Sequence, residues 1–296
     1  MKNWKTVTKK LVVLGLSASL FVTTGTACGS SASAKADAKT KDSEGNVVLK
    51  GIVALTPHQE ILEYAKDELK KEGIVIEVVN DGSDDLGNER VAKGEADFNY
   101  FQHDPYLQSV NDQNGYNLVN AGDIHVEPIS LYSDKYKDVS QIKDGDVIAI
   151  PNDGTNEYRA LSVLEDSGFI TLDDEAKEAL DASVKNVKEY KKKIKIVEID
   201  AAQVIPTRED YDAYITNTNR ILEAKITPNR LAQESAKSPY ANIIAVKSDR
   251  KNDANIKKLV KVLQSEKVRK FIEEKYDGAV IPAALTQSEK SPTSKR

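Results

Sequence analysis

Short runs of β-branched residues alternate with stretches of helical periodicity along most of this chain, and this alternation constrains its fold more than any other feature. Residues 47–55 form the first run, apolar side chains then recur at helical spacing over 61–69, and the next run spans 74–79. The pattern predicts further strands at 96–100, 128–132, 147–150, 194–199, 211–216 and 242–246. It predicts further helices at 104–110, 156–167, 173–193, 255–264 and 266–276. Such alternation is typical of an α/β fold with a mostly parallel sheet and helices on its faces.

Length and charge limit the classes to which this protein can belong. A chain of 296 residues is long enough for about two domains. The 42 Lys and Arg residues and 47 Asp and Glu residues give a net charge of −5. This balance argues against a nucleic-acid partner, because such binding depends on neutralising phosphates. The single cysteine excludes an internal disulfide framework and a cysteine-rich zinc site.

Residues 1–27 have the pattern of a secretory signal peptide. Lysines near the start precede a largely apolar stretch at 11–22, which is too short to cross a bilayer as a helix. Small residues then lead directly to Cys28, and this order resembles the lipobox at which bacterial lipoproteins receive a diacylglyceryl anchor. We therefore expect lipidation at Cys28; an ordinary secretory signal with an incidental cysteine is the alternative. The polar residues 28–46 are expected to form a flexible tether, and residues 286–296 a disordered tail.

The sequence contains no recognised catalytic signature. It has no G-x-S-x-G turn, no H-E-x-x-H helix and no C-x-x-C pair. Residues 82–87 have the glycine spacing of a phosphate-binding loop, but they lack the following Lys-Ser/Thr and carry two aspartates that would repel phosphate. We therefore expect a protein without enzymatic activity or cofactor. An envelope hydrolase is the alternative, which turnover of a generic ester or peptide would support.

The segment 99–106 combines aromatic and polar side chains at the end of a predicted strand. The carboxyl ends of strands are where open α/β sheets bind ligands. Tyr100, Phe101 and Tyr106 could enclose an apolar side chain, while His103 offers one directional hydrogen bond. Alternatively, Phe101 belongs to the core and Tyr100 covers it. The segment alone does not decide between a binding site and core packing.

A second polar segment, residues 151–159, joins a buried strand to the start of a helix. The free N–H groups and the positive end of the helix dipole favour an anion at this position. Arg159 follows about one turn into the helix and could hold a carboxylate through two parallel hydrogen bonds. In the alternative interpretation Thr155 or Asn156 only caps the helix, and Arg159 pairs with Glu157 or Asp153.

Several motifs, taken together, resemble the NlpA/MetQ lipoproteins, which are methionine-binding subunits of an ABC importer. They lie at 99–103, 127–128, 148–153, 155–157, 159–161, 238–242, 271–276 and 278–283. The similarity keeps the same order from about residue 51 to residue 283 and is more specific than either polar segment alone.

The resemblance implies a periplasmic-binding-protein fold, in which two α/β lobes are joined by two crossover strands and hold a ligand in the cleft between them. Lobe one would comprise residues 47–128 plus 246–285, and lobe two residues 129–245. The crossovers would fall near 127–131 and 243–246. Such a fold closes around its ligand by a hinge, and the closed form is the one that docks on the permease.

The resemblance also implies which residues contact a methionine ligand. These residues are Tyr100, Phe101 and His103 of the first lobe, and Asn156, Arg159, Asn217 and Asn219 of the second. Arg159 would hold the α-carboxylate, an asparagine carbonyl would accept the α-ammonium, and the aromatic rings would flank the thioether. Two departures from the family leave the ligand's side chain open. Residues 84–88 lack the usual aromatic residue and proline, and Arg220 stands where the family often has tyrosine.

We therefore expect a monomeric, lipid-anchored solute-binding protein on the extracytoplasmic face of a bacterial membrane. Its ligand would be L-methionine, another small amino acid or a methionine-containing dipeptide, and its partners an ABC permease and its ATPase. The competing hypothesis is metal delivery, in which His58, His103 and His125 act with a carboxylate, since metal sites favour imidazole and oxygen ligands. Loss of metal on chelation, with His103→Ala abolishing rebinding, would support that hypothesis.

Overall fold

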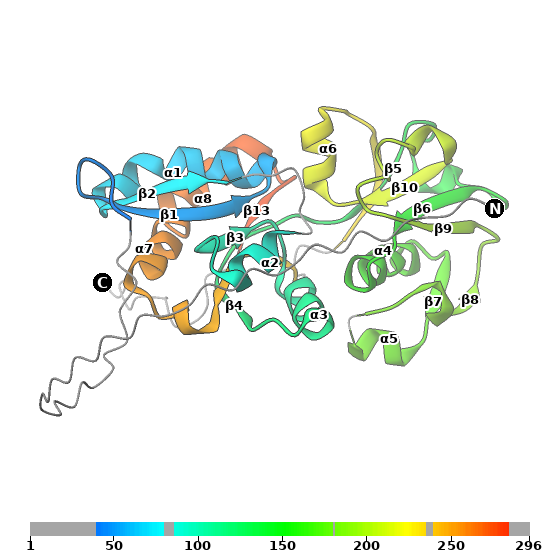
Figure 1. Ribbon diagram of the computed structural model, residues 1–296. Coiled ribbons are helices and arrows are strands. Elements are labelled where there is room, and N and C mark those ends of the chain that lie inside the picture. Colours follow the sequence, from blue (N-terminus) through cyan, green and yellow to red (C-terminus); the bar gives the residue numbers. More distant parts are fainter. Residues whose placement is uncertain (1–39, 80–85, 180, 235–238, 284–296) are drawn as a thin grey trace, which may run out of the picture. The chain divides into compact units, whose positions relative to one another are not determined.

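The computed structural model describes residues 40–79, 86–179, 181–234 and 239–283. The expected signal peptide (1–27), the expected lipidation residue Cys28 and the expected tail (286–296) lie outside these ranges. The described chain forms two larger β-sheets and one two-stranded sheet, with helices packed against them (Figure 1). The expected α/β class is confirmed.

A mixed six-stranded sheet combines the first and the last parts of the described chain. Its strands, in spatial order, are β13 (Ile281–Pro282), β4 (Leu118–Val126), β12 (Ala241–Lys247), β3 (Phe98–Tyr100), β1 (Val47–Val53) and β2 (Ile74–Val78). Alternate side chains of β12 enter two different cores, since Ile244 and Val246 belong to one and Ile243 and Ala245 to the other. The sheet is therefore buried on both faces.

Helices cover both faces of this sheet. Their bounds are α1 (Glu60–Lys71), α2 (Leu86–Lys93), α3 (Asp104–Asn114), α7 (Ala254–Leu263) and α8 (Glu266–Tyr276). In α1 the buried residues Ile61, Leu62, Ala65 and Leu69 recur on one face, as helical periodicity predicts. α1, α7 and α8 share one core with β1, and α2 and α3 pack in the other core.

A mixed five-stranded sheet comes from the middle of the sequence. Its strands, in spatial order, are β11 (Asn229–Gln233), β5 (Ser130–Ser133), β10 (Ala213–Thr216), β6 (Val147–Pro151) and β9 (Lys195–Ile199). α4 (Gly154–Asp166) packs on β6 and shares a core with the two-stranded sheet of β7 (Ile170–Leu172) and β8 (Val187–Tyr190). The other helices here are α5 (Asp174–Ala179) and α6 (Thr218–Ala224). Short helical turns lie at Leu55–Gln59, Val139–Gln141, Val184–Asn186, Arg208–Asp210 and Ser248–Arg250.

The expectation of mostly parallel sheets is wrong. β1 runs parallel to β2 and β3, and β6 runs parallel to β9 and β10. β5 and β12, in contrast, are antiparallel to their neighbours. β5 is the first strand after the chain passes from the six-stranded to the five-stranded sheet, and β12 is the first strand after it returns. Strand–helix alternation does not reveal such a return, so the sequence pattern missed it.

Sequence periodicity does not predict β4, although β4 has nine residues. Asn120, Gly122 and Asp123 interrupt its apolar pattern. Gly122 permits the close approach of α7, because a Cβ atom on it would lie 2.3 Å from Cγ1 of Val260. Gly122 therefore interrupts the strand pattern in the sequence, and the same residue is required for α7 to pack on β4.

The predicted helix over 173–193 is wrong for most of its length. α5 ends at Ala179, the side chain of Ser183 caps a short turn, and β8 follows. Lys and Glu residues favour a helix by propensity, but pairing with β7 gives this segment its backbone hydrogen bonds instead. Tertiary pairing overrides local preference here.

The last part of the expected tether is ordered. The carboxylate of Asp42 accepts hydrogen bonds from the backbone N–H groups of Glu44 and Asn46 at 2.9 and 2.8 Å. The N–H of Val48 donates to the carbonyl of Thr40 at 2.9 Å. Residues 40–46 therefore form a turn against the start of β1, and the tether expected over 28–46 is wrong for this part.

Two segments connect the sheets. The first, residues 127–129, lies between β4 and β5, and the second joins the end of β11 at Gln233 to the start of β12 at Ala241. The expected second crossover at 243–246 instead lies within β12, which pairs in the six-stranded sheet. We therefore propose that lobe two ends near residue 233 rather than at residue 245.

Candidate functional site

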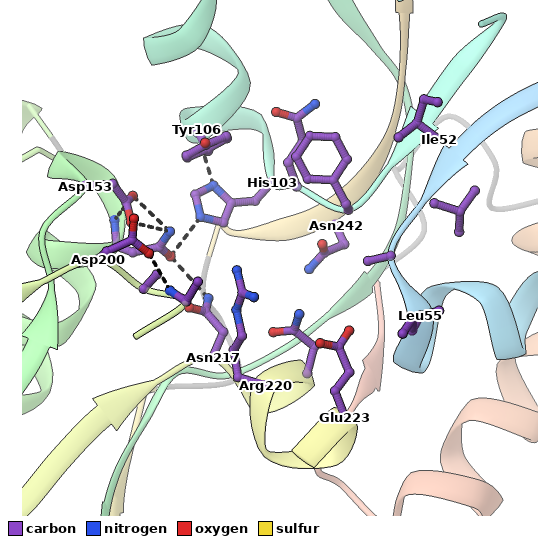
Figure 2. A pocket seen from close by; sticks show the side chains of 18 of the residues that line it. Ile52, Leu55, His103, Tyr106, Asp153, Asp200, Asn217, Arg220, Glu223 and Asn242 are labelled. Atoms are coloured by element: carbon purple, nitrogen blue, oxygen red, sulfur yellow. Dashed lines mark hydrogen bonds between the residues drawn. The ribbon is translucent and has the colours of Figure 1, made fainter. Parts of the chain in front are cut away.

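A cavity of about 560 Å³ is lined by segments of both larger sheets (Figure 2). Its apolar wall is formed by the end of β1 and the residues that follow β1 and β3, namely Ile52, Val53, Ala54, Leu55 and Phe101. Its polar wall includes Gln102, His103, Tyr106, Asn152, Asp153, Asn156, Asp200, Asn217, Asn219, Arg220, Glu223 and Asn242. Figure 2 shows His103, Asp153 and Asn217 on one side of the cavity and Leu55 on the other. This volume and this mixed lining suit a small polar molecule with an apolar portion.

His103 lies at the start of α3 and is held in one tautomer. Its Nδ1 accepts a hydrogen bond from the backbone N–H of Tyr106 at 3.1 Å, so the ring proton resides on Nε2. Nε2 then donates to Oδ1 of Asn156 at 3.2 Å. Burial, and secondarily the charge of Arg159, lowers the pKa of His103 to about 3. His103 therefore presents a neutral ring with a directed N–H.

Asn156 connects three parts of the site. It lies in the first turn of α4, where the Asp153 side chain caps the helix by accepting the N–H of Asn156 at 3.0 Å. Its Oδ1 accepts from His103, from Nη1 of Arg159 at 3.1 Å and from Nδ2 of Asn217 at 3.2 Å. The expected site residues His103, Asn156, Arg159 and Asn217 thus share one hydrogen-bond network.

Arg159 lies behind Asn156 and is only 1 % exposed. Its Nε and Nη2 donate to the carboxylate of Glu234 at 3.1 and 2.7 Å, and Nη2 also donates to the backbone carbonyl of Glu127 at 2.9 Å. The guanidinium also lies 4.5 Å from the centre of the Tyr240 ring. Arg159 therefore contacts both segments that connect the sheets, and it is not among the residues that line the cavity.

Tyr100 and Phe101, although adjacent, have different surroundings. Tyr100 is completely buried in the core with α1, and its hydroxyl donates to Nδ1 of His125 at 2.5 Å. Phe101 lines the cavity and packs against Gly87, where a Cβ atom would lie 2.6 Å from the ring. Of this aromatic pair, Phe101 can touch a ligand and Tyr100 supports the wall behind it.

A buried polar network lies beneath the cavity. Nε2 of His125 donates to Oε1 of Glu127 at 2.7 Å, and Nε2 of His58 lies 2.9 Å from Oδ1 of Asn242. His58 Nε2 also lies 3.4 Å from Oε1 of Glu127. Burial lowers the pKa of His58 to about 4 and that of His125 to about 3, so both rings are neutral. Because Asn242 also lines the cavity, the network reaches the candidate site.

The structure does not bring together the three histidines of the metal-delivery hypothesis. His103 bonds to Asn156, whereas His58, His125 and Glu127 place their ligand atoms within 4.8 Å of one another. A metal ion on Nε2 of His58, the nitrogen that faces Glu127, would move the ring proton to Nδ1. Nδ1 has no hydrogen-bond partner among the described residues. A metal-bound histidine needs such a partner, so a hydrogen-bonded network fits these residues better than a metal site.

Some lining residues were not among the expected site residues. Asp200 directly follows β9, so the rule that ligands bind at the carboxyl ends of strands could have found it. Asn242 lies near the start of β12, so the rule about strand ends does not identify it. In the sequence it stands out only as part of the family motif at 238–242. Gln102 is one of three buried amide side chains, with Asn88 and Asn99, that bond to one another behind the cavity wall. The sequence does not show that these three amide side chains contact one another; the structure does.

The fold and the cavity define a two-lobed α/β substrate-binding protein of the periplasmic-binding-protein class. The chain belongs to the NlpA lipoprotein family, whose model matches residues 51–284. It is 37 % identical to the methionine-binding lipoprotein MetQ of Bacillus subtilis over 93 % of this chain and 99 % of that protein. It is 36 % identical to the membrane lipoprotein TpN32 of Treponema pallidum over 77 % of this chain and 85 % of that protein.

Solved structures agree with this assignment. A putative lipoprotein from Ruminococcus gnavus is 45 % identical, with a TM-score of 0.76 over 80 % of this chain and 99 % of that one. A nutrient-binding protein from Burkholderia cenocepacia, solved bound to methionine, is 38 % identical, with a TM-score of 0.75 over 80 % of this chain and 100 % of that one. The expected family and two-lobed fold are confirmed. Among the described residues, no helix has the length and apolar character needed to cross a membrane.

Replacing Arg159 by alanine should lower the free energy of unfolding by about 3–5 kcal/mol, because a buried ion pair with Glu234 and a hydrogen bond to the carbonyl of Glu127 would both be lost. The matched control is Arg208→Ala, which breaks a more exposed ion pair with Asp134 and should cost at most about 1 kcal/mol. Urea denaturation of both variants measures the difference. Equal, small losses would show that the Arg159 pair contributes no more than a surface ion pair.

All three histidines should remain neutral in the folded protein between about pH 5 and 8, because burial depresses each pKa below the unfolded value of about 6.5. Below pH 6.5 the unfolded chain binds protons that the folded chain does not, so these rings favour unfolding as the pH falls. Imidazole ¹⁵N NMR measures the protonation directly. A folded-state midpoint near 6.5 for any ring would contradict its burial.

Proposed function

We propose that this protein binds L-methionine, or a closely similar amino acid, in the cavity between its lobes and delivers it to the permease and ATPase of an ABC importer. The observation that carries the proposal is the cavity itself. It combines an apolar wall with converging amide and imidazole groups, on the fold of a Burkholderia cenocepacia protein solved with methionine. The similarity to the Bacillus subtilis methionine-binding lipoprotein supports the same ligand.

The proposed contacts are the lining residues Phe101, His103, Asn156, Asn217 and Asn219. The ring of Phe101 would pack against the thioether, which makes favourable contacts with aromatic edges. The amide side chains of Asn156, Asn217 and Asn219 offer both donors and acceptors to the zwitterionic end of the ligand. Arg159 and Tyr100 would act through these residues, since Arg159 bonds to Asn156 and Tyr100 supports the wall that ends in Phe101.

Calorimetry should detect binding of L-methionine to the purified protein, and mass spectrometry should detect an amino acid released on denaturation. Asn219→Ala should weaken binding about tenfold or more, because a buried ligand group would lose a hydrogen-bond partner. Asn114→Ala is the matched control, since Asn114 is an exposed residue of α3 outside the cavity. Absence of both released amino acid and binding heat in the wild-type protein would refute the proposed function.

We also propose that Cys28 carries a lipid anchor that holds the protein at the extracytoplasmic face of the membrane. The position of Cys28 after a small-residue site and the membership of the chain in a lipoprotein family support this proposal. One acyl chain binds membranes only weakly, so stable anchoring requires the two or three chains of a lipoprotein. Detergent phase partitioning should move Cys28→Ala from the detergent phase to the aqueous phase. A variant that stays equally membrane-bound would rule out this anchor.

A further inference from the structure

A lysine-rich segment, residues 185–195, lies outside the candidate site. It contains six lysines, one glutamate and no arginine, in a chain whose net charge is −5. The segment runs from a short helical turn through β8 and a connecting loop to the first residue of β9 (Figure 1). Five of its lysines are exposed, namely Lys185, Lys188, Lys191, Lys193 and Lys195.

The backbone of the lysine-rich segment is held by hydrogen bonds. The N–H groups of Lys191 and Lys192 donate to the carbonyl of Phe169 at 2.9 and 3.0 Å. The side chain of Lys192 packs over the Phe169 ring, with Nζ 5.1 Å from the ring centre. The N–H of Lys193 donates to the carboxylate of Asp144 at 3.1 Å. The exposed lysines therefore extend from an ordered backbone.

Within the described part of the chain, none of the five exposed lysines forms an ion pair, although Lys188 interacts with Asp173 at longer range. The lysines of α1 and α8 differ, because each pairs with a glutamate. These pairs are Lys66–Glu63, Lys70–Glu44, Lys71–Glu68, Lys267–Glu68, Lys270–Glu266 and Lys275–Glu60. The lysine-rich segment thus retains positive charge that can act on a partner outside the chain.

The chemistry of the segment favours a broad anionic surface over a single anionic group. A guanidinium, with its fixed pair of donors, suits one phosphate or carboxylate, and the segment has no arginine. Ammonium groups on flexible stems attract a layer of phosphates without fixed geometry, as polybasic segments beside membranes do. Tyr190, between these lysines, is 45 % exposed. A ring with a polar tip suits the boundary between headgroups and acyl chains.

We propose that the lysine-rich segment binds the anionic phospholipid headgroups of the membrane to which the chain is anchored. The segment then adds a reversible, electrostatic contact to the lipid anchor proposed at Cys28. Because none of its residues lines the candidate site, this contact does not occupy the ligand cavity. A competing explanation is that lysines on edge strands prevent pairing between copies, since β9 is the last strand of its sheet.

The test uses residues 29–296, which contain every described strand and helix but lack the signal peptide and Cys28. This anchor-free chain should sediment with vesicles of equal parts phosphatidylglycerol and phosphatidylcholine. It should bind vesicles of phosphatidylcholine alone about tenfold more weakly or worse, because they have no net charge. Raising the salt concentration from about 0.05 M to about 0.5 M should weaken binding to the anionic vesicles, because salt screens exposed charges.

The decisive variant carries glutamine in place of four exposed lysines, Lys185, Lys188, Lys191 and Lys193. It should bind the anionic vesicles at least about tenfold more weakly than the wild-type chain, because four attractive charges are lost. Arginine at the same four positions should preserve binding, since the attraction depends on charge rather than on donor geometry. Circular dichroism and analytical ultracentrifugation of each variant measure its folding and its association state.

A matched control removes the same net charge from paired lysines. It carries glutamine in place of Lys66, Lys71, Lys267 and Lys270, which lie on α1 and α8. This control should bind the anionic vesicles within about threefold of the wild-type chain, because these charges are already paired within the protein. Equal losses in the two glutamine variants would assign the effect to net charge and refute the proposal.

Other outcomes also refute the proposal. A wild-type chain that binds neither kind of vesicle has no such contact, and one that binds soluble polyphosphate but no vesicle uses the segment for a different polyanion. A glutamine variant of the lysine-rich segment that keeps vesicle binding but self-associates would show that these lysines protect an edge strand. None of these results depends on methionine binding, which calorimetry measures separately in the same variants.

Discussion

The buried guanidinium of Arg159 is the interaction on which the geometry of the site depends. It joins the first turns of α4 to the carbonyl of Glu127 in one connecting segment and to the carboxylate of Glu234 in the other. A buried charge requires close and well-oriented partners, so these bonds fix three separate parts of the chain relative to one another. Because Nη1 also holds Asn156, the orientation of a cavity-lining amide is set by the same group that links the two connections.

Glu127 extends this constraint into the six-stranded sheet. Its backbone accepts from Arg159, while its side chain accepts from His125, whose ring in turn accepts from Tyr100. Burial raises the pKa of the Glu127 carboxyl, and the positive charge of Arg159 opposes this effect. His58 and His125 beside it are neutral, so they contribute hydrogen bonds rather than charge to this part of the interior. The connecting segment thus couples core packing in one lobe to helix position in the other.

The elements of this molecule that depend on local sequence patterns could be predicted from the sequence. The apolar runs of β1, β2, β6 and β12 and the periodicity of α1 were sufficient to place those elements. β4 was missed because Gly122, which α7 requires for close packing, breaks the apolar run. In the site, His103 and Asn156 could be predicted, because one follows a strand end, the other lies at a helix start, and both belong to family motifs. The burial of Arg159 could not be predicted, because it results from pairing with Glu234, which lies 75 residues further along the chain.

Burial also separates the two arginines near the cavity, Arg159 and Arg220. The cost of removing Arg159 from water is offset by the carboxylate of Glu234 and the carbonyl of Glu127. Arg220, in contrast, lines the cavity and is partly exposed. The buried pair thus belongs to the segments that connect the two sheets, whereas Arg220 contributes charge to the cavity lining.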